Sequence, residues 1–264
     1  MPRLDSILAG GLPGEPGRLA ALDRAIRAPL PLSTGVGVLA ADAEAPTALV
    51  SALLAGVLAA RRPHRVLAVG AQNIERGVGW QLGLAAGAAS SDADVAARAA
   101  ATNSTEATAG LPRSPGGAWA LELGERPSAW WEAVAPISRF FDFVVTDWGT
   151  PDELDDPRAA SAIMLVVTRA DVEAQQAGVD LVARLSDQGT AVLLAVADTG
   201  TGTPVLREVA KVTGASWLPA DRRLRSARPA VTGALRYATS RSVLELAARV
   251  VDAAVARNRA GVVR

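Results

Sequence analysis

The chain of 264 residues contains no cysteine and a single histidine, His64. The missing thiols exclude disulfides, thiolate zinc sites and cysteine nucleophiles, and one imidazole cannot form a cluster of histidine metal ligands. Most Ser-His-Asp arrangements lose their central residue for the same reason. Lysine is almost as scarce, since Lys211 is the only one and arginine supplies the other basic groups. These absences exclude several common types of catalytic and metal-binding site.

Net charge and long apolar runs are lacking too. Lys+Arg and Asp+Glu are both 27, so the formal net charge is zero and gives no overall attraction to nucleic acid or anionic lipid. The apolar run at 46–60 is shorter than the ~20 residues of a bilayer span, and no signal-peptide pattern opens the chain. We therefore expect a cytoplasmic protein that binds neither nucleic acid nor membrane.

What the chain does contain is a regular alternation of short apolar runs and helical patterns. Residues 1–17 are rich in glycine and proline and predict a flexible leader, followed by one domain over 18–264. Strands are predicted at 35–40, 64–70, 118–124, 141–147, 161–168, 190–198 and 215–221. Helices are predicted at 18–28, 46–61, 128–140, 171–189, 203–214 and 240–259, with one or two more in the weakly patterned region 71–117.

Strands that are apolar on both faces are covered on both faces, which indicates a parallel sheet between layers of helices. The predicted fold class is therefore α/β: a doubly wound, mostly parallel sheet of seven or eight strands in a three-layer α/β/α arrangement. Ligands of such sheets bind beyond the carboxyl ends of the strands. The loops that matter most are then 41–46, 70–79, 147–153, 168–171 and 198–203.

The first of these loops has the strand–turn–helix layout that often holds a phosphate, yet its sequence 41-ADAEAPT-47 contains no glycine and no lysine. Asp42 and Glu44 would oppose a phosphate there, although backbone N–H groups at a helix start still attract anions. Another interpretation is that Asp42 or Glu44 caps the helix that follows.

Two further loops carry candidate ligands. Asp147 ends a strand, where an acid can hold Mg²⁺ through water or can accept N–H groups of a turn. The stretch 199-TGTGTP-204, with Thr199 and Gly200, follows a strand directly and could line a nucleotide base or form a plain turn.

Taken together, these pieces resemble the MinD/ParA family of deviant P-loop ATPases, and most closely the MinD-like ATPase domains associated with actinobacterial type VII secretion. The matching stretches are 27-RAPLPL-32, the strand–loop–helix at 36–60, 65-RVLAVGAQ-72, 140-FFDFVVTDWGTP-151, and 218-LPAD-221 followed by the C-terminal helix. They extend over about residues 20–260. The resemblance implies a P-loop NTPase-like fold.

The phosphate loop of that family reads K-G-G-x-G-K-[ST] and falls without gaps on residues 41–47. Its signature lysine becomes Ala41, its glycines Asp42, Ala43 and Ala45, and its phosphate-binding lysine Pro46, while the hydroxyl survives as Thr47. The catalytic Asp of the second strand becomes Gly70, and a later Asp becomes Gln72. The acid after the fourth strand is kept as Asp147.

The resemblance thus implies a pseudo-ATPase that needs no cofactor and acts as a protein-binding or regulatory scaffold. Its partner would be a MinD-like paralogue, a type VII secretion component or a second copy of the chain. An alternative is a protein that binds ATP or ADP with slow or no hydrolysis. Its nucleotide-binding residues would be Asp42, Glu44, Thr47, Asp147, Gly149, Thr199 and Gly200, with Thr47 and Asp147 on any Mg²⁺. An unrelated Rossmann-type enzyme fits less well, because the glycines of 77-GVGWQLG-83 lie too far beyond their strand.

Overall fold

The structure, a computed structural model, describes residues 14–72, 76–85, 91–124, 127–150, 153–222, 229 and 235–262. Most of the predicted leader lies outside these residues. Its last positions already belong to helix α2 (Glu15–Ile26), which begins three residues earlier than the predicted helix at 18–28.

Seven strands form one sheet in the part of the chain that the structure describes. They are β1 (Thr34–Ala40), β2 (Val66–Gly70), β3 (Trp119–Glu122), β4 (Phe143–Gly149), β5 (Ile163–Arg169), β6 (Ala191–Ala197) and β7 (Ser216–Leu218). Their order is β3-β2-β4-β1-β5-β6-β7, and every pair of neighbours is parallel. Each coincides with a predicted strand, which confirms the α/β fold class, and the described residues contain no eighth strand.

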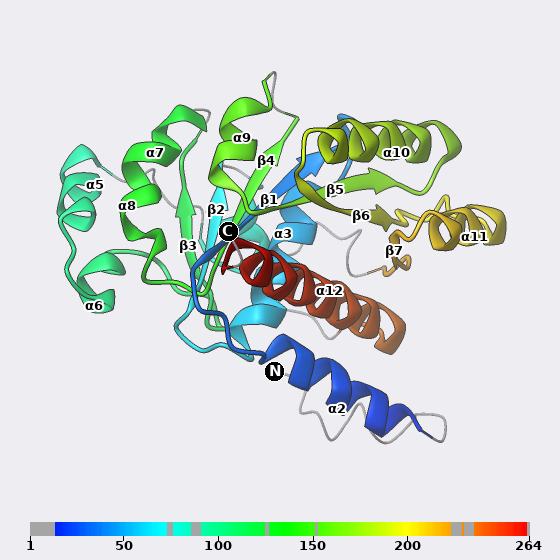
Figure 1. Cartoon of the computed structure of the whole chain (residues 1–264), viewed down its shortest axis with the longest axis horizontal. Coiled ribbons are helices and arrows are strands. Elements are labelled where there is room, and N and C mark those ends of the chain that lie inside the picture. The colour runs from blue at the N-terminus through cyan, green and yellow to red at the C-terminus, as the bar shows by residue number, and fades with distance from the viewer. Residues whose placement is uncertain are drawn as a thin grey trace.

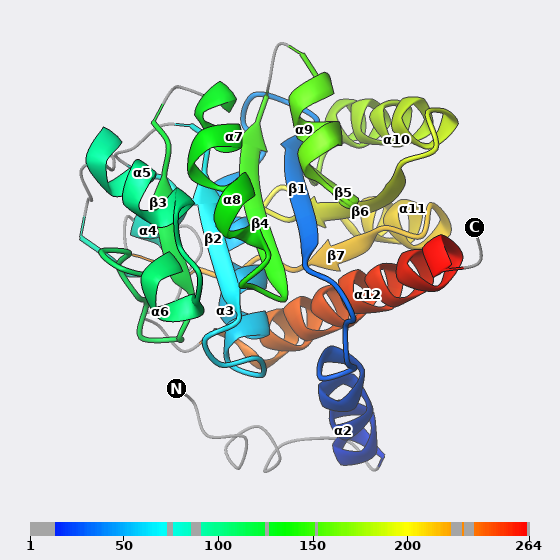
Figure 2. The same cartoon turned by 60° about the vertical axis from the view of Figure 1, so that its left-hand side comes forward.

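Helices cover both faces of this sheet (Figures 1 and 2). One apolar core lies under α3 (Thr47–Ala59) and α12 (Tyr237–Val262), with α2 packed on α12. The opposite core lies under α7 (Trp130–Ala133), α8 (Ala135–Ser138) and α10 (Val172–Asp187). Helix α11 (Pro204–Val212) lies beside the edge strand β7, and α9 (Asp155–Ala160) contacts β1. The arrangement confirms the three predicted layers.

The predicted helices agree best with the structure where the apolar periodicity of the sequence is strong. The predicted helix at 128–140 is broken into a 3₁₀ turn (Pro127–Ala129), α7 and α8, with Pro136 in the first turn of α8, where its missing N–H is tolerated. The weak region 71–117 contains α4 (Val78–Gln81), α5 (Asp92–Ala99) and α6 (Ser104–Ala107). Helix α9 was not predicted, because its sequence DDPRAA has no apolar period.

The long C-terminal helix α12 packs into one of the apolar cores. Leu244, Leu246, Val250 and Val251 are all buried in the core against the sheet and its helices. Among the described residues, every helix is too short or too polar to cross a lipid bilayer.

Candidate functional site

The candidate site lies where the carboxyl ends of β4, β1 and β5 meet, because these three strands are neighbours in the sheet. Strand β1 leads into the loop 41–46 and then into α3. Asp147 lies near the carboxyl end of β4 (Phe143–Gly149), and Arg169 is the last residue of β5. The topology therefore brings together side chains that are more than a hundred residues apart in sequence.

The loop folds onto itself through its own backbone groups. The Ala45 N–H donates to the Asp42 carbonyl at 3.0 Å, and the Thr47 N–H donates to the Ala45 carbonyl at 2.8 Å. The Glu44 N–H donates to Asp42 Oδ1 at 3.1 Å. Pro46 has no N–H at all. Several of the donors with which a glycine-rich loop would hold a phosphate are thus satisfied internally or missing.

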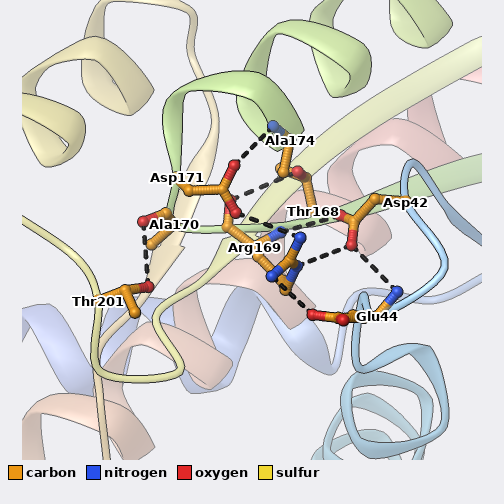
Figure 3. Close-up of polar contacts among 8 residues, drawn as sticks. All are labelled: Asp42, Glu44, Thr168, Arg169, Ala170, Asp171, Ala174 and Thr201. Atoms are coloured by element: carbon orange, nitrogen blue, oxygen red, sulfur yellow. Dashed lines mark hydrogen bonds and ion pairs between the residues drawn. The ribbon is translucent and has the colours of Figure 1, made fainter.

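Arg169 neutralises the acids of this loop (Figure 3). Its Nε donates to Asp42 Oδ1 at 2.8 Å, and its Nη1 lies 2.8 Å from Glu44 Oε2. The Arg169 N–H also donates to Asp42 Oδ2 at 3.4 Å. Arg169 therefore binds both carboxylate oxygens of Asp42, one through its guanidinium and the other through its backbone N–H, and its guanidinium also holds Glu44.

The third carboxylate around Arg169 belongs to Asp171, whose Oδ2 lies 3.5 Å from Nη2. Asp171 also caps α10 by accepting the Ala174 N–H at 2.8 Å (Figure 3). The hydrogen bond and charge of Asp42 raise the pKa of Arg169, with smaller contributions from Glu44 and Asp171. Arg169 thus joins the loop after β1 to the helix after β5.

The structure corrects one interpretation of the loop. The N-cap position of α3 is Pro46, and no side chain caps this helix, so neither Asp42 nor Glu44 does so. Asp42 instead forms the turn with the Glu44 N–H and binds Arg169. An arginine across the sheet edge outcompetes the helix end for these carboxylates, because a charged donor makes the stronger hydrogen bond.

Thr47 and Asp147 do lie together, as the resemblance implied. Asp147 is 3 % exposed, and burial raises its pKa to about 6, while the Thr47 hydroxyl, the Gly149 N–H and the Gln72 amide lower it. The Gly149 N–H and the Gln72 Nε2 donate to Asp147 Oδ1 at 3.2 and 3.3 Å. Asp147 therefore makes the turn contact that its position after a strand predicts.

Gly149 and Gly70 both make room for a neighbouring polar side chain. Gly149 has φ 57°, and a Cβ there would lie 1.6 Å from Nε2 of Gln72, the residue at the position of the family's later Asp. A Cβ on Gly70 would lie 1.8 Å from Oε2 of Glu122. At both positions a larger residue would displace the side chain that now fills the space.

Glu122 brings a carboxyl group beside Gly70, the position at which the resemblance leads one to expect an Asp. The register aligns Gly70 with Glu122 on one side and with Asp147 on the other, so the three residues form one row across β3, β2 and β4. Glu122 Oε1 accepts the Gly79 N–H at 2.6 Å, whereas its buried Oε2 has no hydrogen-bond partner among the residues that the structure describes. Burial, together with the charge of Asp147, raises the pKa of Glu122 to about 7.

The loop with Thr199 and Gly200 is closed by Asp198, whose Oδ1 accepts the N–H groups of Gly200 and Gly202 at 2.7 and 3.0 Å. Thr199 and Pro46 both line a cavity of about 60 Å³ between α3 and the ends of β6 and β7. Sites for drug-sized ligands usually measure about 300–1,000 Å³, so this cavity is too small for a nucleotide base.

The sequence predictions located the edge of the sheet and included the loop 168–171, but they singled out neither Arg169 nor Glu122. Both residues end strands, so the rule that placed Asp147 could have identified them. Their partners could not be read from the sequence, because Asp42 and Arg169 are 127 residues apart. Thr47 and Asp147 are brought together, and Ala41, Pro46 and Gly70 lie along the same edge.

The seven-stranded parallel sheet, its strand order and its covering helices define a P-loop NTPase-like α/β fold. No protein-family model matches the chain, and a comparison with curated proteins finds no significant match. Solved structures, in contrast, are similar in fold.

The chain is similar in structure to MinD and ParA family ATPases. The cell division ATPase MinD of Pyrococcus furiosus has a TM-score of 0.62 and 18 % identity, covering 83 % of this chain and 98 % of that protein. A ParA family ATPase of Chlorobium tepidum has a TM-score of 0.62 and 15 % identity, covering 82 % and 98 %. MinD of Pyrococcus horikoshii complexed with Mg-ADP has a TM-score of 0.60 and 15 % identity, covering 82 % and 95 %.

Proposed function

We propose that the chain is a MinD/ParA-like pseudo-ATPase that acts as a protein-binding or regulatory scaffold. The observation that supports this most is the pairing of Arg169 with Asp42 and Glu44. The cation that could attract a phosphate at this edge is already bound to the acids of the loop. Arg169 therefore satisfies the carboxylates of the loop without any ligand.

The electrostatics of the loop favour the same proposal. A triphosphate placed there would meet two carboxylates, a proline instead of a lysine, and N–H groups that already donate to Asp42 and Ala45. Phosphoryl transfer depends mostly on positioning and charge neutralisation, and the loss of one main donor typically costs ~10²–10³ in rate. Several donors are absent here together, so we expect no useful hydrolysis and no required cofactor.

The proposal is tested by titrating Mg-ATP into the protein while tryptophan fluorescence is followed. Trp148 directly follows Asp147 in β4 and is buried, so its fluorescence reports changes at this end of the strand. We expect no saturable signal up to millimolar ATP, the range of weak ligands, and no phosphate release above that of buffer. ATP turnover at rates typical of an enzyme, about 1 s⁻¹ or more, would refute the proposal.

The alternative is that the chain binds ATP or ADP without efficient hydrolysis. Its support is the contact of Thr47 with Asp147, which keeps the hydroxyl and carboxylate that could face Mg²⁺, and the Mg-ADP complex of the similar Pyrococcus horikoshii MinD. Saturable binding that needs Mg²⁺ and is lost in both Thr47→Ala and Asp147→Asn would favour it. The same two variants should not differ from the wild type if the pseudo-ATPase proposal is right.

The partner we propose rests on the family resemblance: a MinD-like paralogue or a type VII secretion component, with a second copy of the chain as a further candidate. Co-expression with each protein, followed by size-exclusion chromatography, tests this directly. We expect a complex that elutes as one species without added nucleotide. Separate elution with every candidate would contradict the scaffold part of the proposal without affecting the loss of hydrolysis.

A further inference from the structure

Helix α11 presents an apolar stripe to solvent. Val205, Val209 and Val212 are 71 %, 43 % and 86 % exposed and follow the i, i+4, i+7 spacing of one helix face. Leu206 and Ala210 of the same helix are buried, so the stripe is separate from the core-facing side. Among the described residues, seven large apolar side chains are exposed, and three of them are these valines. Such a concentration on one short helix indicates a contact surface.

Two opposite charges accompany the stripe. Glu208 stands three residues after Val205 and therefore on the same side of the helix. Lys211 follows it, and the two side chains are 3.5 Å apart and mostly exposed. The stripe thus offers an acid and then a base, in the direction of the chain.

A cleft of about 650 Å³ lies at the carboxyl end of β1, between Thr150 and Leu154 on one side and α10 on the other. Leu39 and Ala41 line its β1 side, and Leu154, Ala177 and Leu181 give it further apolar surface. Asp180 and Arg184, one turn apart on α10, supply charges to the same cleft. The volume is sufficient for several branched side chains.

The two charged side chains of the cleft make few polar contacts with the described residues. Asp180 accepts one hydrogen bond, from Gln176 Nε2 at 2.8 Å, and Arg184 makes no ion pair with any residue that the structure describes. Along α10 the order is again an acid followed by a base. If a second helix with an acid followed by a base packs antiparallel to α10, its acid lies beside Arg184 and its base lies beside Asp180.

We propose that α11 of one copy of the chain binds in this cleft of a second copy, antiparallel to α10. The three valines enter the apolar part of the cleft, Glu208 pairs with Arg184 of the next copy, and Lys211 pairs with Asp180. The charged residues are separated by about 4.5 Å along α11 and about 6 Å along α10, which flexible side chains can match. Parallel packing would set Glu208 against Asp180 and Lys211 against Arg184, so the charges select one orientation.

The contact joins two different surfaces and is therefore head-to-tail. Such interfaces produce chains or rings of copies instead of closed two-fold dimers. The interface involves one nine-residue helix, so association should be weak and dependent on concentration. This inference does not depend on whether the chain binds nucleotide, since α11, Asp180 and Arg184 lie outside the loop at 41–47 and only Ala41 of that loop lines the cleft.

Sedimentation velocity of the full chain, from about 1 μM to about 1 mM, tests the inference. The wild type should shift to larger species as the concentration rises. Val209→Asp removes the stripe and Ala177→Trp fills the cleft, and each should weaken association about tenfold or more. Leu32→Asp, at a 68 % exposed apolar residue outside both surfaces, is the matched control and should associate like the wild type.

Mixing the two variants gives the decisive result. Val209→Asp retains an intact cleft and Ala177→Trp an intact stripe, so an equimolar mixture should form 1:1 dimers that grow no further. A second pair of variants covers the case that Ala177→Trp does not fold. Arg184→Glu should lose association, and Arg184→Glu combined with Glu208→Arg in one chain should regain it. A wild type that stays monomeric throughout, or a mixture and a charge-exchanged double variant that both stay monomeric, would overturn the inference.

Discussion

Arg169 is the residue on which the loop at 41–47 depends most directly, because it contacts Asp42, Glu44 and Asp171 at once. We expect Arg169→Met to lower the free energy of unfolding by about 1 kcal/mol or less, since the arginine is partly exposed and its pairs are screened by solvent. Urea unfolding in low salt measures this change. It should shrink at about 1 M salt, where the Debye length falls to about 3 Å.

Arg24→Met is a suitable control for that measurement, because Arg24 is an exposed arginine of α2 that makes no ion pair with the described residues. Its replacement should change the free energy of unfolding less than Arg169→Met does. Equal effects of the two substitutions, or an effect of Arg169→Met that ignores salt, would contradict the role given to Arg169.

Glu122 makes the stability of the chain depend on pH. Burial raises its pKa from 4.5 to about 7, so the folded chain holds a proton that the unfolded chain has released. The contribution of neutral Glu122 is therefore complete below pH 4.5 and is lost as the pH rises toward 7 and above. Asp147, with a pKa raised to about 6, acts in the same direction.

Glu122→Gln should remove part of this dependence, because the amide cannot ionise. Relative to the wild type, the variant should gain on the order of 2 kcal/mol of stability between pH 4.5 and pH 8. Thermal unfolding across that range gives the answer. A stability difference that stays constant with pH would show that Glu122 is not protonated in the folded chain.

Gly70 is needed because Glu122 occupies the space above it. Gly70→Asp would restore the acid of the family motif, but its Cβ would lie 1.8 Å from Glu122 Oε2. We expect it to destabilise the chain by about 1–3 kcal/mol through overpacking and the added buried charge. Glu122→Ala in the same chain should restore part of that loss, and urea unfolding of both variants measures it. Equal stability of Gly70→Asp and the wild type would contradict this packing.

At the scale of elements, the strands could be predicted because each is a short apolar run between polar loops, and parallel pairing buries both faces. Residues 66–70, for example, are buried throughout. Helix α9 and the breaks between α7 and α8 could not be predicted in this way, since contacts with the sheet decide them. The position of the site at the carboxyl edge followed from the fold class, but its chemistry did not. Arg169 binds Asp42 only because β5 and β1 are neighbours.

We do not expect a single substitution in the loop before α3 to create Mg-ATP binding. Pro46→Lys restores the lysine that the family motif requires, yet the Thr47 and Ala45 N–H groups would still donate within the loop. Asp42 and Glu44 would remain and could pair with the new lysine. We therefore expect no gain of Mg-ATP binding by calorimetric titration. Micromolar binding by this single variant would mean that the lysine alone was limiting.

At the scale of the whole molecule, the chain is similar in fold to MinD and ParA ATPases. The two apolar cores consist mainly of strand and helix residues, and only Ala41 and Ala45 of the loop pack against them, so we expect the fold to persist without nucleotide. Surfaces such as the valine stripe and the cleft beside α10 are then free to serve protein contacts.

We propose that Arg169, Asp42 and Glu44 close the place that a triphosphate would need. A crystal structure of the protein grown with ATP and Mg²⁺ tests it most directly. The account predicts Arg169 bound to Asp42 and the loop 41–47 folded on its own N–H groups, with no nucleotide beside Thr47. A triphosphate seated next to Thr47 and Asp147, with Arg169 turned away from Asp42, would contradict it.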